Sequence, residues 1–230
     1  EVDAFVPVTE CVIFVGEMII ATMLFAQAAI FRSRARVVLA SGFVFGSLLL
    51  IHHALTFPGA FAPQGLLEPG LNGTAWIMIF RRTAMPLAII AYAALEWTES
   101  KAPPDARRPP QRVLLWVAAA IVLSAAATMV SLRGGELLPP MFVNRTEAHF
   151  VNLPIFNLSN IVIIAIAVAS LLLKRTSVLD VWLLVVLASW AMQLFLNLTL
   201  HARFTLGWYC LFLVVVVSSL FMLLALIAES

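Results

Sequence analysis

Charge is scarce in this chain. Of its 230 residues only 11% are Asp, Glu, Lys or Arg, whereas 63% are hydrophobic. A soluble domain averages roughly 25% charged residues, so this composition excludes an ordinary water-soluble globule and indicates that lipid is the solvent. The formal net charge is only +2, and the basic residues do not gather into one patch, which excludes nucleic acid as a partner.

Signatures of catalysis and of cofactors are also missing. The sequence has no glycine-rich phosphate loop, no paired-histidine metal motif and no nucleophile elbow, so we expect a non-catalytic chain without cofactor or metal. The only lysines, Lys101 and Lys174, fall between apolar runs, which excludes a retinal Schiff base within a bundle. Two cysteines, Cys11 and Cys210, are expected to be buried thiols, with a disulfide as the alternative.

The chain does contain seven long apolar runs, with no stretch between them large enough for a soluble domain. Each run is about the ~20 residues that a helix needs to cross a bilayer. A backbone in lipid must satisfy its own hydrogen bonds, so the runs are read as helices. The sequence therefore predicts an all-α, polytopic integral membrane bundle that forms one domain of residues 1–230. Its transmembrane helices are expected at 10–31, 37–56, 73–95, 113–131, 152–173, 181–200 and 207–228.

The basic residues predict the orientation of the bundle. Cytoplasmic loops are enriched in Lys and Arg, and nine of the 14 basic residues lie in the connections after the first, third and fifth runs. The N-terminus is therefore expected outside and the C-terminus in the cytoplasm. The seventh run stops as it reaches the inner face, so we expect a cytoplasmic partner domain after Ser230.

Polar residues within the runs gather in the half that this topology places outside, whereas the inner half is nearly all aliphatic and aromatic. We hypothesise that they line a polar cavity, open to the outside, that binds a small polar or anionic ligand. The candidate residues are Glu17, His52, His53, Arg81, Arg82, His149, Asn157, Asn160, Gln193, Asn197 and His201. Alternatively, the amides join helices, the arginines extend to lipid headgroups, and the histidines are simply hydrogen bonded.

The charged members of this set are expected to pair. A charge within a membrane costs roughly 2.5–3.5 kcal/mol by insertion scales. Glu17 is the acid at the depth of Arg81 and Arg82, and neighbouring helical residues point about 100° apart, so at most one arginine pairs well with it. We expect substitutions of Glu17 and Arg82 to be coupled in their effect on stability.

Several stretches resemble a known family. His53–Leu67 is similar to the second-helix exit and first outer loop of the type-four membrane-associated sensor family of bacterial signalling proteins. The resemblance continues at Ala75-Trp76, Leu138–Pro140, Ser177–Trp182 and Arg203–Tyr209, in order and over nearly the whole chain. The chain departs from the family where Arg81-Arg82 replace a usual Trp-His, and where Cys210-Leu211 replace a common Gly-Arg.

The resemblance implies an input module ahead of a histidine kinase or diguanylate cyclase in the bacterial inner membrane. A ligand that favours one packing of the bundle would shift the last helix and bias a downstream dimer. Two other functions stay open from the sequence. One is a small transporter or channel that uses the cavity as a vestibule. The other is a membrane redox protein that holds haem between its outer histidines.

Overall fold

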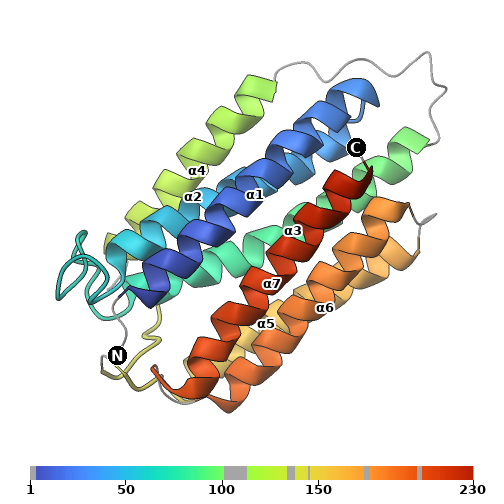
Figure 1. Ribbon diagram of the computed structural model, residues 1–230. Coiled ribbons are helices and arrows are strands. Elements are labelled where there is room, and N and C mark those ends of the chain that lie inside the picture. Colours follow the sequence, from blue (N-terminus) through green and yellow to red (C-terminus); the bar gives the residue numbers. More distant parts are fainter. Residues whose placement is uncertain are drawn as a thin grey trace.

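In the computed structural model the chain forms a bundle of long helices (Figure 1). The structure describes residues 4–100, 113–133, 138–144, 146–173, 177–200 and 204–229. Seven helices, each long and apolar enough to cross a membrane, lie within these ranges, and no β-sheet does. They are α1 (Phe5–Ile30), α2 (Arg34–Thr56), α3 (Gly73–Ser100), α4 (Val113–Arg133), α5 (Asn152–Leu172), α6 (Val178–Thr199) and α7 (Leu206–Glu229). The predicted all-helical membrane bundle is confirmed.

Several helices extend beyond the predicted runs because polar residues at their ends belong to them. Ser33 and Ser177 cap α2 and α6, and the Ser177 cap is a capping box with Asp180. α1 begins at Phe5 rather than at residue 10, and within its first turns the Thr9 hydroxyl donates a 2.8 Å hydrogen bond to the Phe5 carbonyl. Hydropathy alone places these boundaries too far inside.

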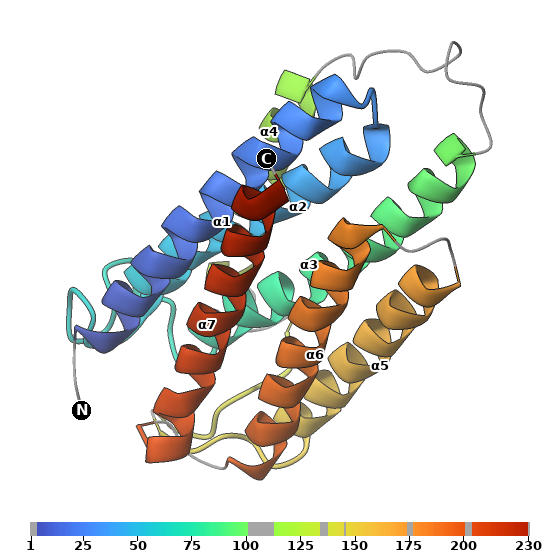
Figure 2. The same ribbon diagram turned by 45° about the vertical axis from the view of Figure 1, so that its right-hand side comes forward.

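Six helices form a closed ring. α1 packs on α2, α2 on α3, α3 on α5, α5 on α6, α6 on α7 and α7 on α1, whereas α4 lies outside against α2 and α3. Two views show α1, α2 and α4 on one side and α5, α6 and α7 on the other (Figures 1 and 2). We call the end where α1 begins the N-terminal end, and the end where α7 finishes the C-terminal end.

Small residues let the helices approach closely. Gly42 and Gly46 of α2 have the spacing that permits close helix contacts in membranes. A Cβ on Gly42 would lie 2.5 Å from the Cβ of Ala88, and one on Gly46 would lie 3.3 Å from the sulfur of Met85. The peripheral helix α4 likewise turns a buried stripe of small residues inward, at Ala120, Ser124, Thr128 and Ser131.

The main apolar core extends from the middle of the bundle to its C-terminal end, and includes Ile20, Leu39 and Ile89. Among the described residues, one charged side chain is fully buried in this half. Asp180 is fully buried at the start of α6 and accepts a 3.1 Å hydrogen bond from the Tyr92 hydroxyl. The sequence prediction that this half is nearly all aliphatic and aromatic is therefore incomplete, because Asp180 belongs to the helix and not to the preceding loop.

Loops at the N-terminal end are fastened to the helices. The Asn72 side chain accepts 2.8 Å hydrogen bonds from the backbone N–H groups of Met141 and Phe142. The Trp76 indole donates to the carbonyl of Pro139 at 3.1 Å. Gly65 has a φ of +83°, and a Cβ there would collide with the backbone of α2. The loop after α2 and the one before α5 therefore form a fixed cover.

Candidate functional site

An ion pair joins α1 to α3 near the middle of the bundle. Nη2 of Arg81 contacts Oε1 of Glu17, and both side chains are buried. The Ser47 hydroxyl of α2 donates a 3.2 Å hydrogen bond to the other carboxylate oxygen, Oε2. Gly46 lies next to this group, since a Cβ there would be in van der Waals contact with Oε2 at 3.6 Å. The carboxylate thus connects three helices and has a cationic partner.

The neighbouring arginine has no such partner. Arg82 is half-buried, and its side chain makes no hydrogen bond or ion pair among the described residues. Its Nε is fully buried and unsatisfied. The expected coupling of Arg82 to Glu17 is wrong, because Arg81 takes that position and the two side chains leave α3 in different directions. The backbone carbonyl of Arg82 also lacks its usual helical hydrogen bond, because Pro86, four residues further along α3, has no N–H.

Arg82 borders a cavity of about 80 Å³ toward the N-terminal end of the bundle. His53 of α2 and Asn197 of α6 also line it, so the cavity brings together three of the polar residues predicted from sequence. Its aromatic wall contains Trp208 and Phe212 of α7. The remaining lining is mainly apolar, from Phe57, Ala75, Met78, Ile79, Phe142, Ala148, Leu153, Leu200 and Leu211.

A smaller space lies deeper in the bundle. It measures about 10 Å³, and Arg81, Arg82 and Gln193 line it together with Trp190. The Gln193 amide also donates a 3.4 Å hydrogen bond to the carbonyl of Leu211 on α7. Because Arg82 borders both spaces, its guanidinium stands between the cavity and the buried ion pair.

Two asparagines lie along the buried face of α5. Asn160 accepts a 3.0 Å hydrogen bond from the Thr83 hydroxyl, so it joins α5 to α3. Asn157 is buried, and its Nδ2 has no hydrogen-bond partner. On this helix face they lie between Leu153, which lines the cavity, and Ile164, which lines the deeper space.

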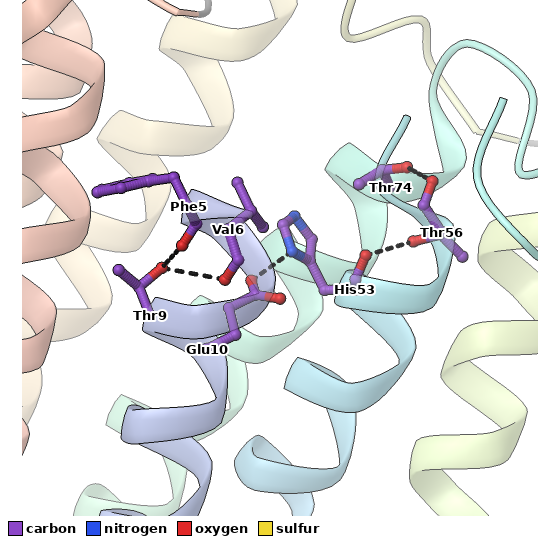
Figure 3. A network of polar contacts seen from close by, with 7 residues as sticks. All are labelled: Phe5, Val6, Thr9, Glu10, His53, Thr56 and Thr74. Carbon is purple, nitrogen blue, oxygen red and sulfur yellow. Dashed lines mark hydrogen bonds and ion pairs between the residues drawn. The ribbon is translucent and has the colours of Figure 1, made fainter. Parts of the chain in front are cut away.

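A second buried pair was missed from sequence. Nδ1 of His53 lies 2.5 Å from Oε1 of Glu10, and both side chains are almost fully buried (Figure 3). The same end of α2 is joined to α3, since Thr74 donates a 2.9 Å hydrogen bond to the Thr56 carbonyl. Glu10 was overlooked because the predicted helix started there, although a carboxylate one and a half turns inside α1 needs a partner.

Aromatic side chains surround the start of α7. Trp208 packs against Phe57 and Phe204 with ring centroids 5.9 and 5.3 Å apart. Phe5 of α1 meets Tyr209 edge-to-face at 4.7 Å. The first turn of α7 is therefore held by α1, by the end of α2 and by the preceding turn, directly beside the cavity.

Other predicted residues lie elsewhere. His149 accepts hydrogen bonds of 3.4 and 3.3 Å from the backbone N–H groups of Val151 and Asn152 at the start of α5. His52 is half-buried on α2 and lines none of the three main pockets. His201 lies outside the described residues. The histidines therefore do not converge on one point in the described part of the chain.

The cysteines differ from expectation. Cys11 and Cys210 are both free and exposed on the surface of the bundle, so the expectation that they are buried is wrong. Among the residues that the structure describes, no three His, Cys, Asp or Glu side chains are grouped closely enough to hold a metal ion.

These features define the class of the protein: a multi-pass helical membrane protein with a small, cation-bearing cavity between its helices. Residues 1–230 match the MASE4 family model, described as a membrane-associated sensor, integral membrane domain, and the chain belongs to this family. The resemblance seen in the sequence is thereby confirmed over the whole chain. Neither a curated protein nor a solved structure matches it.

Proposed function

We propose that this membrane sensor domain binds a small anion in the cavity beside Arg82 and passes the binding event to a cytoplasmic output through α7. The observation that carries the proposal is the composition of the cavity wall. Trp208, Leu211 and Phe212 of α7 line the same space as Arg82. A ligand there contacts α7 directly, so it favours one position of that helix over another.

The ligand class follows from charge and size. Glu17 is already paired with Arg81, and Glu10 lies against His53, so neither carboxylate neutralises Arg82. A guanidinium offers several N–H donors in a plane, which suits a carboxylate or another small oxyanion. The cavity volume of about 80 Å³ limits the ligand to a few heavy atoms, of the order of acetate.

The positions of the basic residues support an outward-facing cavity. The connections after α1, α3 and α5 carry most of the Lys and Arg, and they lie at the C-terminal end of the bundle. In this orientation the cavity is near the outer face of the bacterial inner membrane, and α7 ends in the cytoplasm. The output that we propose is a histidine kinase or diguanylate cyclase following Ser230, working as a homodimer.

Tryptophan fluorescence tests the binding step. Acetate, nitrate and inorganic phosphate are titrated separately into the purified chain in nanodiscs, and Trp208 reports on the cavity. We expect at least one anion to change the emission saturably, Arg82→Gln to abolish the change, and Trp208→Phe to remove the signal. Flat titrations with all three anions contradict the anion site.

Impermeant thiol labelling tests the orientation. Single-cysteine variants Gln64→Cys and Arg34→Cys place an exposed thiol at the N-terminal and the C-terminal end, respectively, in a background without Cys11 and Cys210. In intact cells we expect the reagent to label residue 64 at once and residue 34 only after permeabilisation. The reverse pattern overturns the outward-facing cavity.

A further inference from the structure

A second site lies on the outside of the ring, in a groove between α1 and α2 near the N-terminal end. The groove has a volume of about 190 Å³ and an almost entirely apolar lining. Cys11, Ile51 and Phe61 are exposed along it, whereas Leu50 is buried in its floor. Because α1 and α2 are membrane-spanning helices, a groove on this surface opens sideways into lipid.

One polar group belongs to the groove. Glu10 lines it with only 2% of its surface exposed. Oε1 of Glu10 faces Nδ1 of His53, but both carboxylate oxygens are buried and neither accepts a hydrogen bond among the described residues, so Oε2 has no partner on the protein. Leaving a buried acceptor unsatisfied is unfavourable, more so when it is charged, so a donor supplied by a ligand is favourable here.

The chemistry of this acceptor selects the ligand. A phospholipid phosphate is repelled by the carboxylate, and a full cation competes with His53, which already lies 2.5 Å from Glu10. A neutral O–H donor is not repelled by the carboxylate and does not compete with His53 as a cation does. Phe14 and Phe61 both line the groove, and aromatic side chains suit a flat ring.

We propose that the groove binds a lipid-soluble quinol, with a ring hydroxyl donating to Oε2 of Glu10 and the apolar tail lying in the bilayer. The volume fits: a cavity of about 150 Å³ binds benzene, so 190 Å³ holds one substituted ring. The oxidised quinone has carbonyl acceptors in place of hydroxyl donors and cannot satisfy Glu10. The site therefore distinguishes the reduced form from the oxidised form. It is separate from the anion cavity, although His53 lines that cavity and contacts Glu10.

Protection of Cys11 from N-ethylmaleimide tests this proposal without reference to signalling. The chain is placed in phosphatidylcholine nanodiscs as Cys210→Ser, which leaves Cys11 in the groove, and as Cys11→Ser, which leaves Cys210 outside it. We expect decylubiquinol at about ten times its Kd to slow alkylation of Cys11 about tenfold, since the free fraction falls with 1 + [L]/Kd. Cys210 should react at an unchanged rate, and decylubiquinone should protect Cys11 less.

Two variants assign the effect to the groove. In Glu10→Gln the amide can donate to a quinone carbonyl, so the preference for quinol over quinone should be lost or inverted. Ala54→Phe fills the groove without altering Glu10 or His53 and should abolish protection, whereas Ala188→Phe, exposed on α6, should not.

Three results overturn the proposal. One is equal protection of Cys11 and Cys210, which means simple partition into lipid. Another is protection that survives Ala54→Phe. The third is protection by added phosphatidylglycerol equal to that by quinol, which makes the groove a phospholipid site.

Discussion

The two ends of this bundle are built differently. Toward the N-terminal end, two buried carboxylates, Glu10 and Glu17, face cationic or imidazole partners on other helices, and a cavity remains open beside them. From the middle to the C-terminal end, apolar side chains fill the core, and Asp180 is the buried acid there, held by Tyr92 and by its own helix start. The same seven helices thus combine a half that holds buried charges and a cavity with a closely packed half.

In the function proposed above, this difference separates the detection of a ligand from the transmission of the signal. Space and unsatisfied polar groups allow a ligand to change the N-terminal half at little cost in packing. A close-packed half does not deform continuously, so a shift of α7 at one end is carried to the other as a movement of the helix. α7 takes part in both halves, through Trp208 at the cavity and through Met222 and Leu226 in the core.

Breaking the central ion pair should have the largest effect on stability. Glu17→Ala leaves Arg81 buried without a counter-charge, and such a loss costs about 3–5 kcal/mol. Unfolding in mixed SDS micelles measures it. The double variant Glu17→Ala, Arg81→Ala should cost clearly less than the sum of the two single changes, whereas Glu17→Ala with Arg82→Ala should be additive. Additivity in the first pair contradicts the assignment of Arg81 as the partner.

Substitution of two glycines by alanine tests how tightly the two halves of the bundle are packed. Gly42→Ala brings a Cβ to 2.5 Å from the Cβ of Ala88, so α2 and α3 must separate, and overpacking of this kind costs about 1–3 kcal/mol. Gly16→Ala meets nothing within 4 Å and should stabilise the bundle by about 0.5–1 kcal/mol through helix propensity. Unfolding in mixed SDS micelles measures both changes. Equal changes in the free energy of unfolding for Gly42→Ala and Gly16→Ala would contradict the difference in packing.

Single interhelical hydrogen bonds should matter less. Tyr92→Phe removes the donor to Asp180 near the C-terminal end and should cost about 1 kcal/mol, since the carboxylate keeps its bond to the Ser177 N–H. Thr83→Val removes the bond to Asn160 in the other half and should cost about 0.6 kcal/mol, the average found between membrane helices. A loss above about 3 kcal/mol for Tyr92→Phe would show that the C-terminal half depends on this contact as strongly as the other half depends on its ion pair.

Helix number and helix location were predictable because membrane solvent makes hydrophobicity decisive. Seven apolar runs became seven helices, and three of the polar residues in those runs, Arg82, His53 and Asn197, line one cavity. Helix ends were less predictable, since Ser33 and Ser177 cap α2 and α6 through hydrogen bonds that hydropathy does not register.

Pairings inside the site were harder to predict. Arg81 and Arg82 are adjacent in sequence, and only the rotation of α3 against α1 determines which of them reaches Glu17. Glu10 gave a usable signal, because a carboxylate within a span requires a partner, but the predicted helix start concealed it. The exposure of Cys11 and Cys210 also depends on helix rotation, which an almost uniformly apolar sequence leaves undetermined.

The smallest loss of stability is expected for substitution of Arg82. The same substitution at its neighbour Arg81 is the matched comparison. Arg82 has no partner among the described residues, so Arg82→Gln breaks no ion pair, removes an unsatisfied charge and should not lower the free energy of unfolding. Arg81→Gln should lose several kcal/mol, because it leaves Glu17 buried without its partner. Stabilisation by a ligand should instead depend on Arg82. A bound anion such as acetate should stabilise the wild type and not Arg82→Gln, and Arg82→Lys should keep part of this stabilisation. If Arg82→Gln destabilised the bundle as much as Arg81→Gln, both arginines would be structural, and the cavity would lack the free cation on which anion binding depends.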